Sequence, residues 1–317
     1  MKKNIWIALS LSSLVLLSAC SSDSEPAAGP AGSDAPDAAL LEGLTGTIGS
    51  KDFSEQYILA HITGQMLNAN GADVDVNTKL VGSANVRQAL ESGEFIGYWE
   101  YTGTGWITYL KNTEPITDPQ EQFDAVRDAD AANGIVWLDP APLNNTYAFA
   151  IRRDKAEELG VTTLSDVAKL DPAEQSFCIE SEFSTRDDGW PGLQEAYGFD
   201  VSNDNLVMLD TGVIYKATQE GTDCNFGEVF QTDGRIQALD LVVMEDDLKF
   251  FPVYQGSLTM DAEVMAAHPQ IADVMAKVSP LLTTQEMQRL NARADVDGDE
   301  PEDIATDWLV EQGFIDG

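Results

Sequence analysis

Histidine, cysteine and serine motifs carry much of the chemistry that side chains perform, and this sequence uses them sparingly. It contains two histidines, His61 and His268, which leave little room for a multi-histidine metal site or a histidine-based catalytic triad. The sequence also lacks a Gly-x-Ser-x-Gly elbow, a phosphate-binding Walker loop and a His-Glu-x-x-His motif. We therefore expect no enzyme, no cofactor and no metal site.

An acidic stretch near the C-terminus could be mistaken for a calcium loop. Three aspartates alternate within residues 295–299, as in an EF-hand. That loop requires Gly where this chain has Glu300 and Glu where it has Thr306, so the pattern fails twice. We expect an acidic loop before a helix, with Glu302 and Asp303 near the helix N-terminus, where negative charge is favourable.

The N-terminus has the pattern of an export signal. Lys2 and Lys3 precede an apolar stretch over residues 5–17 that is too short to span a membrane. Residues 17–20 read Leu-Ser-Ala-Cys, similar to the bacterial lipobox, in which the cysteine becomes the acylated first residue. We predict a lipoprotein signal peptide at 1–20, lipidation at Cys20 and a flexible tether at 21–43. The alternative is a plain signal peptide with an incidental cysteine.

Two cysteines remain in the exported part of the chain, Cys178 and Cys224. An even number of cysteines in an oxidising compartment favours a disulfide. Metal ligation is the alternative, but two cysteines with no histidine nearby make a poor zinc site.

The charge of the chain limits its partners. Eighteen Lys and Arg stand against 54 Asp and Glu, so the formal net charge is −36. Such a surface repels phosphate groups, which argues against nucleic acid and against docking on anionic lipids. A charge spread over the whole surface is also what solubility or adaptation to high salt would produce.

Residues 44–144 alternate between short extended segments and helical patterns. We predict strands at 47–50, 73–81 and 95–100, with helices beginning at Ser54 and after Asn85. This alternation is typical of an α/β unit with a mainly parallel sheet.

A second α/β block begins at Thr146, and extended segments at 241–244 and 249–254 lead to a helical C-terminal part. We predict that 44–144 and 252–317 form lobe 1 and that 145–251 form lobe 2. Two α/β lobes with a final return to the first suit a hinged binding protein, whose ligand lies in a central cleft beyond the strand C-termini.

Six short blocks, in order along most of the chain, resemble the signature blocks of one family. They are residues 48–56, 98–104, 145–147, 183–189, 232–236 and 250–254. The family is the substrate-binding proteins of ABC importers for glycine betaine, choline and related osmoprotectants. The resemblance implies a two-lobed, periplasmic-binding-protein-like fold of type II with a ligand cleft between the lobes.

The resemblance also implies an aromatic cage for a quaternary ammonium group. That group donates no hydrogen bond, and proteins recognise it with the negative faces of aromatic rings. The positions that match the family's cage are Tyr101, Tyr147, Phe230 and Tyr254. Phe230 departs from the family, which usually has tyrosine there, so this ring keeps its face and lacks a hydroxyl.

A carboxylate on the ligand would need donors as well. Lys51 and Arg186 match family positions implied in carboxylate contact, and Thr104 offers a hydroxyl. The alternative is that the two cations are solvated or pair with neighbours such as Asp52 or Asp187.

Other matches are weaker. Gln56 and Asn145 align with polar pocket positions of some members, and Glu182 aligns with a position implied in lobe closure. We assign Trp106 and Trp190 to packing first.

The leading hypothesis is an extracytoplasmic binding lipoprotein, anchored to the cell membrane by lipid. It would deliver a betaine-like solute to the membrane permease of an ABC importer. Two alternatives stay open: a choline-type ligand without a carboxylate, and a sensory module that reports the ligand without importing it.

Overall fold

The computed structural model describes residues 36, 38–112, 116 and 118–317. The expected signal peptide and Cys20 lie outside these residues, as does most of the expected tether. The end of that tether is folded, however: Leu41 is buried, and its N–H donates to the carbonyl of Asn70. The folded chain therefore begins before residue 44, because burying a leucine stabilises this turn against the core.

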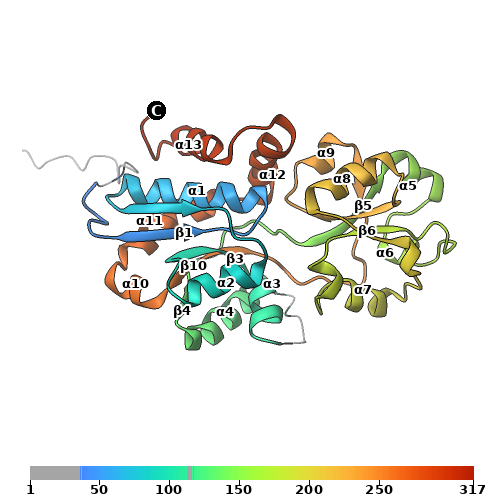
Figure 1. Ribbon diagram of the computed structural model, residues 1–317, viewed down its shortest axis with the longest axis horizontal. Helices are drawn as coiled ribbons and strands as arrows, with labels where there is room; N and C mark the ends of the chain where they lie inside the picture. The colour runs from blue at the N-terminus through green and yellow to red at the C-terminus, as the bar shows by residue number, and fades with distance from the viewer. Residues whose placement is uncertain (1–35, 37, 113–115, 117) are drawn as a thin grey trace, which may run out of the picture. The chain divides into compact units, whose positions relative to one another are not determined.

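The first sheet has five strands in the order β2-β1-β3-β10-β4 (Figure 1). Their bounds are β1 Thr45–Gly49, β2 Asp73–Asn77, β3 Gly97–Tyr101, β4 Ile135–Trp137 and β10 Gly256–Asp261. Strand β1 pairs in parallel with β2 and β3, and β10 pairs antiparallel with β3 and β4.

Helices from the N-terminal and the C-terminal parts of the chain pack on the first sheet. We call this sheet and its helices lobe 1. Helix α1 contacts β2 on one side and α13 on the other (Figure 1). The helices are α1 Ser54–Ala69, α2 Ser83–Glu91, α3 Thr102–Thr104, α4 Pro119–Asp130, α10 Ala262–Ala267, α11 Gln270–Val278, α12 Thr284–Ala292 and α13 Pro301–Glu311.

The second sheet and its helices, which we call lobe 2, repeat this plan in the order β7-β6-β8-β5-β9. The strands are β5 Tyr147–Arg152, β6 Phe177–Ile179, β7 Leu206–Met208, β8 Phe226–Phe230 and β9 Leu241–Val243. The helices are α5 Arg153–Leu159, α6 Leu164–Val167, α7 Trp190–Tyr197, α8 Thr211–Glu220 and α9 Arg235–Ala238.

Both sheets are mixed, which corrects the expectation of mainly parallel pairing. In each sheet one strand runs against the other four, β10 in the first and β5 in the second. These are the two strands that the chain enters directly after crossing from the other sheet. A strand's direction depends on where the chain enters the sheet, and local periodicity does not record that.

The two crossing segments, 138–146 and 244–255, lie side by side. The N–H of Asn145 donates to the carbonyl of Tyr254 over 3.0 Å, and the N–H of Tyr254 donates to Asn144 Oδ1 over 2.8 Å. The hydroxyl of Thr146 adds a bond to the Pro252 carbonyl. This pairing fixes Asn145, Tyr147 and Tyr254 where the two lobes join.

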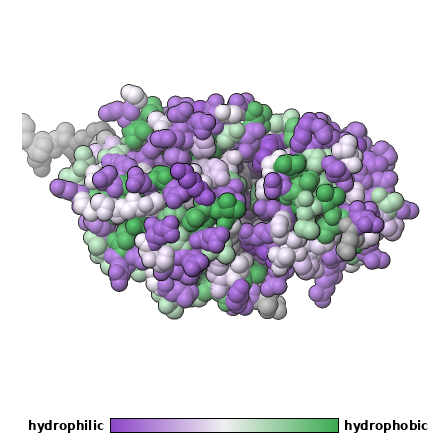
Figure 2. All heavy atoms as spheres, viewed as in Figure 1, coloured by the Kyte–Doolittle hydropathy of each residue, from purple (hydrophilic) through white to green (hydrophobic). Residues whose placement is uncertain are grey.

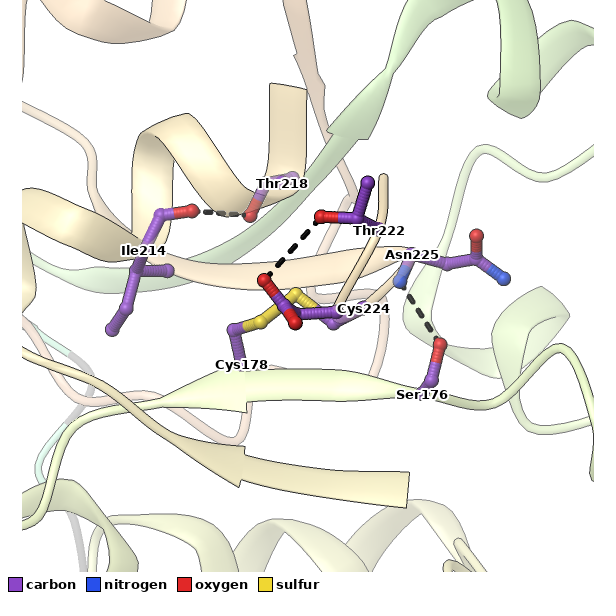
Figure 3. The surroundings of a disulfide bond; sticks show 8 residues. Ser176, Cys178, Ile214, Thr218, Thr222, Cys224 and Asn225 are labelled. Atoms are coloured by element: carbon purple, nitrogen blue, oxygen red, sulfur yellow. Dashed lines mark hydrogen bonds between the residues drawn. A yellow bond between two sulfur atoms is a disulfide. The ribbon is translucent and has the colours of Figure 1, made fainter. Parts of the chain in front are cut away.

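A disulfide joins Cys178 on β6 to Cys224, just before β8 (Figure 3). Both cysteines are buried, and their Cα atoms lie 5.6 Å apart. The N–H of Asn225 donates to Ser176 Oγ beside it. The disulfide thus joins the two neighbouring segments that lead toward the lobe junction.

Hydrophilic residues cover much of the molecular face seen in Figure 2, in keeping with the excess of charged residues in the chain. The larger apolar side chains that are exposed among the described residues are Val81, Met208, Val213, Leu248, Leu281 and Val296. None of the helices in the described ranges is long and apolar enough to cross a membrane.

Candidate functional site

Residues from both lobes and from the crossing segments line one small cavity, with about 40 Å³ of free space. Lobe 1 contributes Lys51, Asp52, Phe53, Ser83, Tyr101 and Thr104, the crossing segments contribute Asn145 and Tyr254, and lobe 2 contributes Tyr147, Glu180, Glu182, Arg186, Thr211 and Phe230. A single water needs roughly 10–15 Å³ by this measure. A ligand of several heavy atoms therefore requires the rings or the lobes to move apart.

Nine of the ten residues expected at a ligand site line this cavity. Gln56 does not. It is fully buried behind the cavity, where its Oε1 accepts from the backbone N–H of Lys51 over 3.3 Å. Its position supports the loop that carries Lys51.

The strands explain why distant residues meet here. Residues 51–53 follow the end of β1, Tyr101 ends β3, and Phe230 ends β8. Carboxyl-terminal strand ends of α/β sheets gather at one edge, where ligands bind. Gly103 allows a further close approach, because a Cβ at this position would lie 2.7 Å from the ring of Tyr254.

Aromatic rings form a continuous wall of the cavity. The ring centroids of Tyr147 and Phe230 lie 5.2 Å apart, and those of Tyr147 and Tyr254 lie 5.3 Å apart in an edge-on pair. Phe53, which sequence analysis did not single out, stacks between Phe230 at 5.5 Å and Tyr101 at 6.3 Å. The wall thus has five rings, which come from both lobes and a crossing segment.

Hydrogen bonds hold two of the phenols. The hydroxyl of Tyr101 donates to Glu55 over 2.6 Å, and the hydroxyl of Tyr254 donates to Asp188 over 2.5 Å. Burial raises the pKa of Tyr101 and Tyr254 well above the ordinary value. These rings are therefore neutral phenols at physiological pH.

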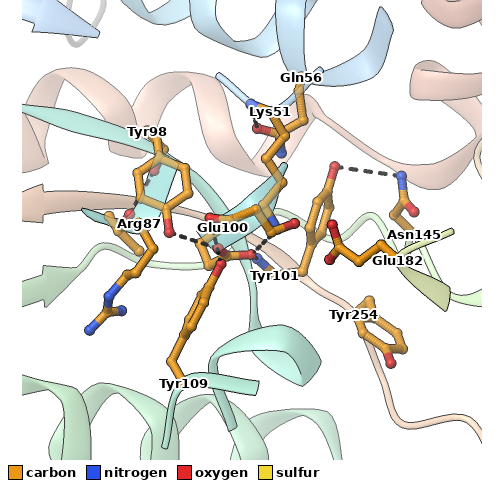
Figure 4. Close-up of polar contacts among 12 residues, drawn as sticks. Lys51, Gln56, Arg87, Tyr98, Glu100, Tyr101, Tyr109, Asn145, Glu182 and Tyr254 are labelled. Carbon is orange, nitrogen blue, oxygen red and sulfur yellow. Dashed lines mark hydrogen bonds and ion pairs between the residues drawn. The ribbon is translucent and has the colours of Figure 1, made fainter. Parts of the chain in front are cut away.

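The ammonium group of Lys51 has a carboxylate partner inside lobe 1. Its Nζ lies 2.5 Å from Glu100 Oε1 and 5.2 Å from the ring centroid of Tyr101 (Figure 4). Glu100 also accepts from the Tyr98 hydroxyl and from the backbone N–H of Tyr101. Glu100 is fully buried, so it fixes both Lys51 and the start of the segment after β3.

The guanidinium of Arg186 is also paired. It donates through Nε and Nη2 to the two carboxylate oxygens of Asp188, and through Nη1 to Glu182 over 3.1 Å. The sequence-based alternative, in which the two cations pair with acidic neighbours such as Asp52 or Asp187, agrees with the structure in that both cations are paired, but the partners are Glu100 and Asp188. Glu100 reaches Lys51 because β1 and β3 are neighbouring strands, whereas Asp188 lies only two residues from Arg186 in the same loop.

Acidic side chains give the cavity a negative end. Burial raises the pKa of Glu180, and the nearby Glu182 raises it further. Burial also raises that of Glu182, but Lys51 and Arg186 outweigh it and leave the pKa of Glu182 below its ordinary value. Glu182 is therefore the carboxylate of this pair that is charged most readily.

One carboxyl group lies behind this negative end. Glu228 is buried on β8, and its Oε2 accepts the backbone N–H of Glu180 over 2.7 Å. Burial, and then the charge of Glu180, raise the pKa of Glu228 well above its ordinary value. Neither Glu180 nor Glu228 was singled out from the sequence, where no pattern marks a buried carboxyl group on a strand.

Two α/β lobes joined by paired crossing segments, with a cavity lined from both, define a two-lobed solute-binding protein. The model of the family described as the substrate-binding domain of ABC-type glycine betaine transport systems matches residues 46–311. The chain belongs to this family. It is thus the extracytoplasmic substrate-binding protein of an ABC import system.

Named relatives agree with this assignment. The chain is 37% identical over 287 residues to a glycine-betaine-binding protein of Pseudomonas aeruginosa, covering 88% of this chain and 91% of that protein. A solved structure described as a glycine betaine/carnitine/choline ABC transporter matches with a TM-score of 0.71 and 28% identity, over 84% of this chain and 98% of the other. The apo structure of YehZ from Escherichia coli matches with a TM-score of 0.65 and 31% identity, over 86% of this chain and 99% of that chain.

Proposed function

We propose that this protein binds a quaternary ammonium osmoprotectant similar to glycine betaine and delivers it to the membrane permease of its ABC importer. The observation that carries the proposal is the wall of five rings, Phe53, Tyr101, Tyr147, Phe230 and Tyr254, in one cavity. Each ring face attracts a trimethylammonium group by roughly 0.5–2 kcal/mol, depending on desolvation.

Donors for the ligand's carboxylate lie beside the rings. An arginine has five N–H groups, and Arg186 uses three of them on Asp188 and Glu182. The remaining N–H groups, with Lys51 Nζ and the hydroxyl of Thr104, can donate hydrogen bonds to a carboxylate. A zwitterion would then meet rings at its cationic end and N–H donors at its anionic end.

A choline-type ligand is the second candidate, because the cavity also contains acidic groups. Lys51 and Arg186 are already neutralised by Glu100 and Asp188, and Glu182 adds a further negative charge. When a cation without a carboxylate binds, Lys51 and Arg186 therefore still have their carboxylate partners, and neither positive charge is left unpaired in the cavity.

Calorimetry against glycine betaine, proline betaine, carnitine and choline separates the two candidates. We expect glycine betaine to bind about tenfold tighter than choline, which is about 1.4 kcal/mol. Arg186→Ala should narrow that gap by weakening betaine, whereas Tyr147→Ala should weaken both ligands. A wild-type preference for choline, or unchanged betaine affinity in Arg186→Ala, would refute the carboxylate assignment.

Lobe movement is part of the proposal. We infer that 44–144 with 252–317 moves against 145–251 about the crossing segments, because ring residues come from both sides of the cavity. Small-angle scattering should show a smaller radius of gyration with saturating ligand. An unchanged profile at saturation would argue against closure.

The proposal includes a lipid anchor at Cys20. It rests on the Leu-Ser-Ala-Cys motif at residues 17–20 and the export pattern before it. Metabolic labelling with a palmitate analogue should label the wild type, and Cys20→Ser should abolish the label and release the protein from membranes. Labelling of the Cys20→Ser variant would place the anchor elsewhere.

A further inference from the structure

We propose that Glu55 is a positioning residue that links the cage ring of Tyr101 to lobe 2. This inference rests on the proposed function and concerns a side chain that does not line the ligand cavity. Glu55 lies in the first turn of α1 and is 2% exposed.

Two ligand-cavity residues share one oxygen of Glu55. Its Oε1 accepts from the hydroxyl of Tyr101 and from Nδ2 of Asn145, each over 2.6 Å. Figure 4 shows the Tyr101 hydroxyl directed toward the amide of Asn145, which lies 3.5 Å away. Glu55 therefore fixes a ring of lobe 1 and an amide of the first crossing segment at the same point.

The other oxygen of Glu55 leads to lobe 2. Its Oε2 accepts from Nδ2 of Asn291 on α12 over 3.0 Å, and the same Nδ2 donates to the carbonyl of Thr232 over 2.9 Å. Thr232 lies two residues after Phe230, a ring of the cavity wall. Glu55, Asn291 and Thr232 are all buried, and hydrogen bonds are stronger in such a low-dielectric interior than in water.

This network connects ring position with lobe position. The hydroxyl of Tyr101 and the carbonyl of Thr232 reach the same carboxyl group, one directly and one through Asn291. A shift of lobe 2 that breaks the Thr232 bond leaves Asn291 with one partner fewer. In the structure, the bond from Asn291 to lobe 2 and the bond that holds Tyr101 at the cavity are formed together, on the two oxygens of one carboxyl group.

Glu55→Gln tests the link with little change of shape. The amide oxygen of Gln can still accept from Tyr101 and Asn145, but its NH2 group then faces Nδ2 of Asn291, donor against donor. Rotation of the Asn291 amide would relieve this, because its Oδ1 has no hydrogen-bond partner among the described residues. That rotation moves Nδ2 away from Thr232 and breaks the bond to lobe 2.

The experiment measures glycine betaine affinity for the wild type, Glu55→Gln, Asn291→Ala and the double variant. We expect each single variant to bind about tenfold more weakly, and the double variant to lie within about twofold of Asn291→Ala, because both changes break one link. A glycine betaine affinity of Glu55→Gln within twofold of the wild-type affinity overturns the inference. Losses that multiply in the double variant overturn it as well.

Asp130→Asn is the matched control. Asp130 is also a buried carboxyl group of lobe 1, and it accepts from Arg87, Asn133 and Trp137, all within lobe 1. Asp130→Asn should lower the melting temperature and leave the affinity for glycine betaine within about twofold of the wild type. An affinity loss equal to that of Glu55→Gln would mean that general destabilisation explains both, which overturns the inference.

Scattering of the ligand-free protein tests the link without ligand. Glu55→Gln should have a larger radius of gyration than the wild type, and Asp130→Asn should not. An unchanged radius in Glu55→Gln contradicts the link to lobe 2. If the wild type binds no quaternary ammonium compound, the proposed function fails, and this comparison still decides the role of Glu55.

Discussion

Tyr254 and Asp188 meet across the junction of the lobes: the Tyr254 hydroxyl donates to Asp188 Oδ2 over 2.5 Å. The same carboxylate holds the guanidinium of Arg186. Asp188 is 4% exposed and lies outside the lining of the cavity. One carboxylate therefore orients both a cage ring and the arginine expected to meet the ligand's carboxylate.

Asp188→Asn should change ligand preference. The variant keeps an acceptor for Tyr254 but removes the negative charge that neutralises Arg186, so the cavity becomes more positive. We expect choline affinity to fall, and the preference for glycine betaine over choline to increase about tenfold. Calorimetry with both ligands measures this ratio. A ratio that stays at the wild-type value would show that Asp188 does not balance the charge of the cavity.

Phe53→Ala should weaken all quaternary ammonium ligands alike. Phe53 stacks between Tyr101 and Phe230, so its loss removes one face from the wall. The expected loss is roughly 0.5–2 kcal/mol for glycine betaine and for choline. Phe314→Ala is the control, because Phe314 packs on Trp308 of α13. If Phe53→Ala binds as the wild type does, Phe53 is a packing residue only.

The position of Phe53 shows what the sequence could and could not predict. The block at 48–56 contains both Lys51 and Phe53, and an aromatic residue two positions after the predicted lysine was the available signal. The motifs predicted the fold and most of the cavity lining because they are local. The partners Glu100 and Asp188 also lie within two recognised blocks. The pairing of Glu100 with Lys51, 49 residues away, depends on how β1 and β3 lie side by side, whereas that of Asp188 with Arg186, two residues away, depends on the local shape of one loop.

Glu228→Gln should make stability less dependent on pH. The pKa of Glu228 is raised above its ordinary value of 4.5 in the folded protein. Above about this pH the unfolded chain loses the proton while the folded protein keeps it, so stability falls as pH rises until the folded pKa is passed. A tenfold change in the acid dissociation constant of Glu228 between the unfolded and folded states lowers the free energy of unfolding by about 1.4 kcal/mol at a pH above both pKa values.

Glutamine cannot ionise and keeps an acceptor for the N–H of Glu180. The melting temperature of Glu228→Gln relative to the wild type should therefore increase from pH 5 toward pH 8. Equal pH profiles for the two proteins would show that Glu228 is not protonated in the folded state.

Loss of the disulfide should affect stability more than binding. The Cys178→Ala/Cys224→Ala variant should lose about 2–5 kcal/mol of unfolding free energy in urea. Glycine betaine affinity should stay within about threefold, since neither cysteine lines the cavity. Thiol counting of the denatured, unreduced wild type should detect neither cysteine as free. Two reactive thiols would contradict the bond.

The central claim is that aromatic rings recognise the positive charge of a trimethylammonium group. Its most direct test compares glycine betaine with tert-butylacetate, in which a neutral carbon replaces the nitrogen and the shape and carboxylate are kept. We predict that glycine betaine binds at least about tenfold tighter in calorimetry, or by about 1.4 kcal/mol, because only a cation gains electrostatic attraction from the ring faces. Equal affinities would contradict it.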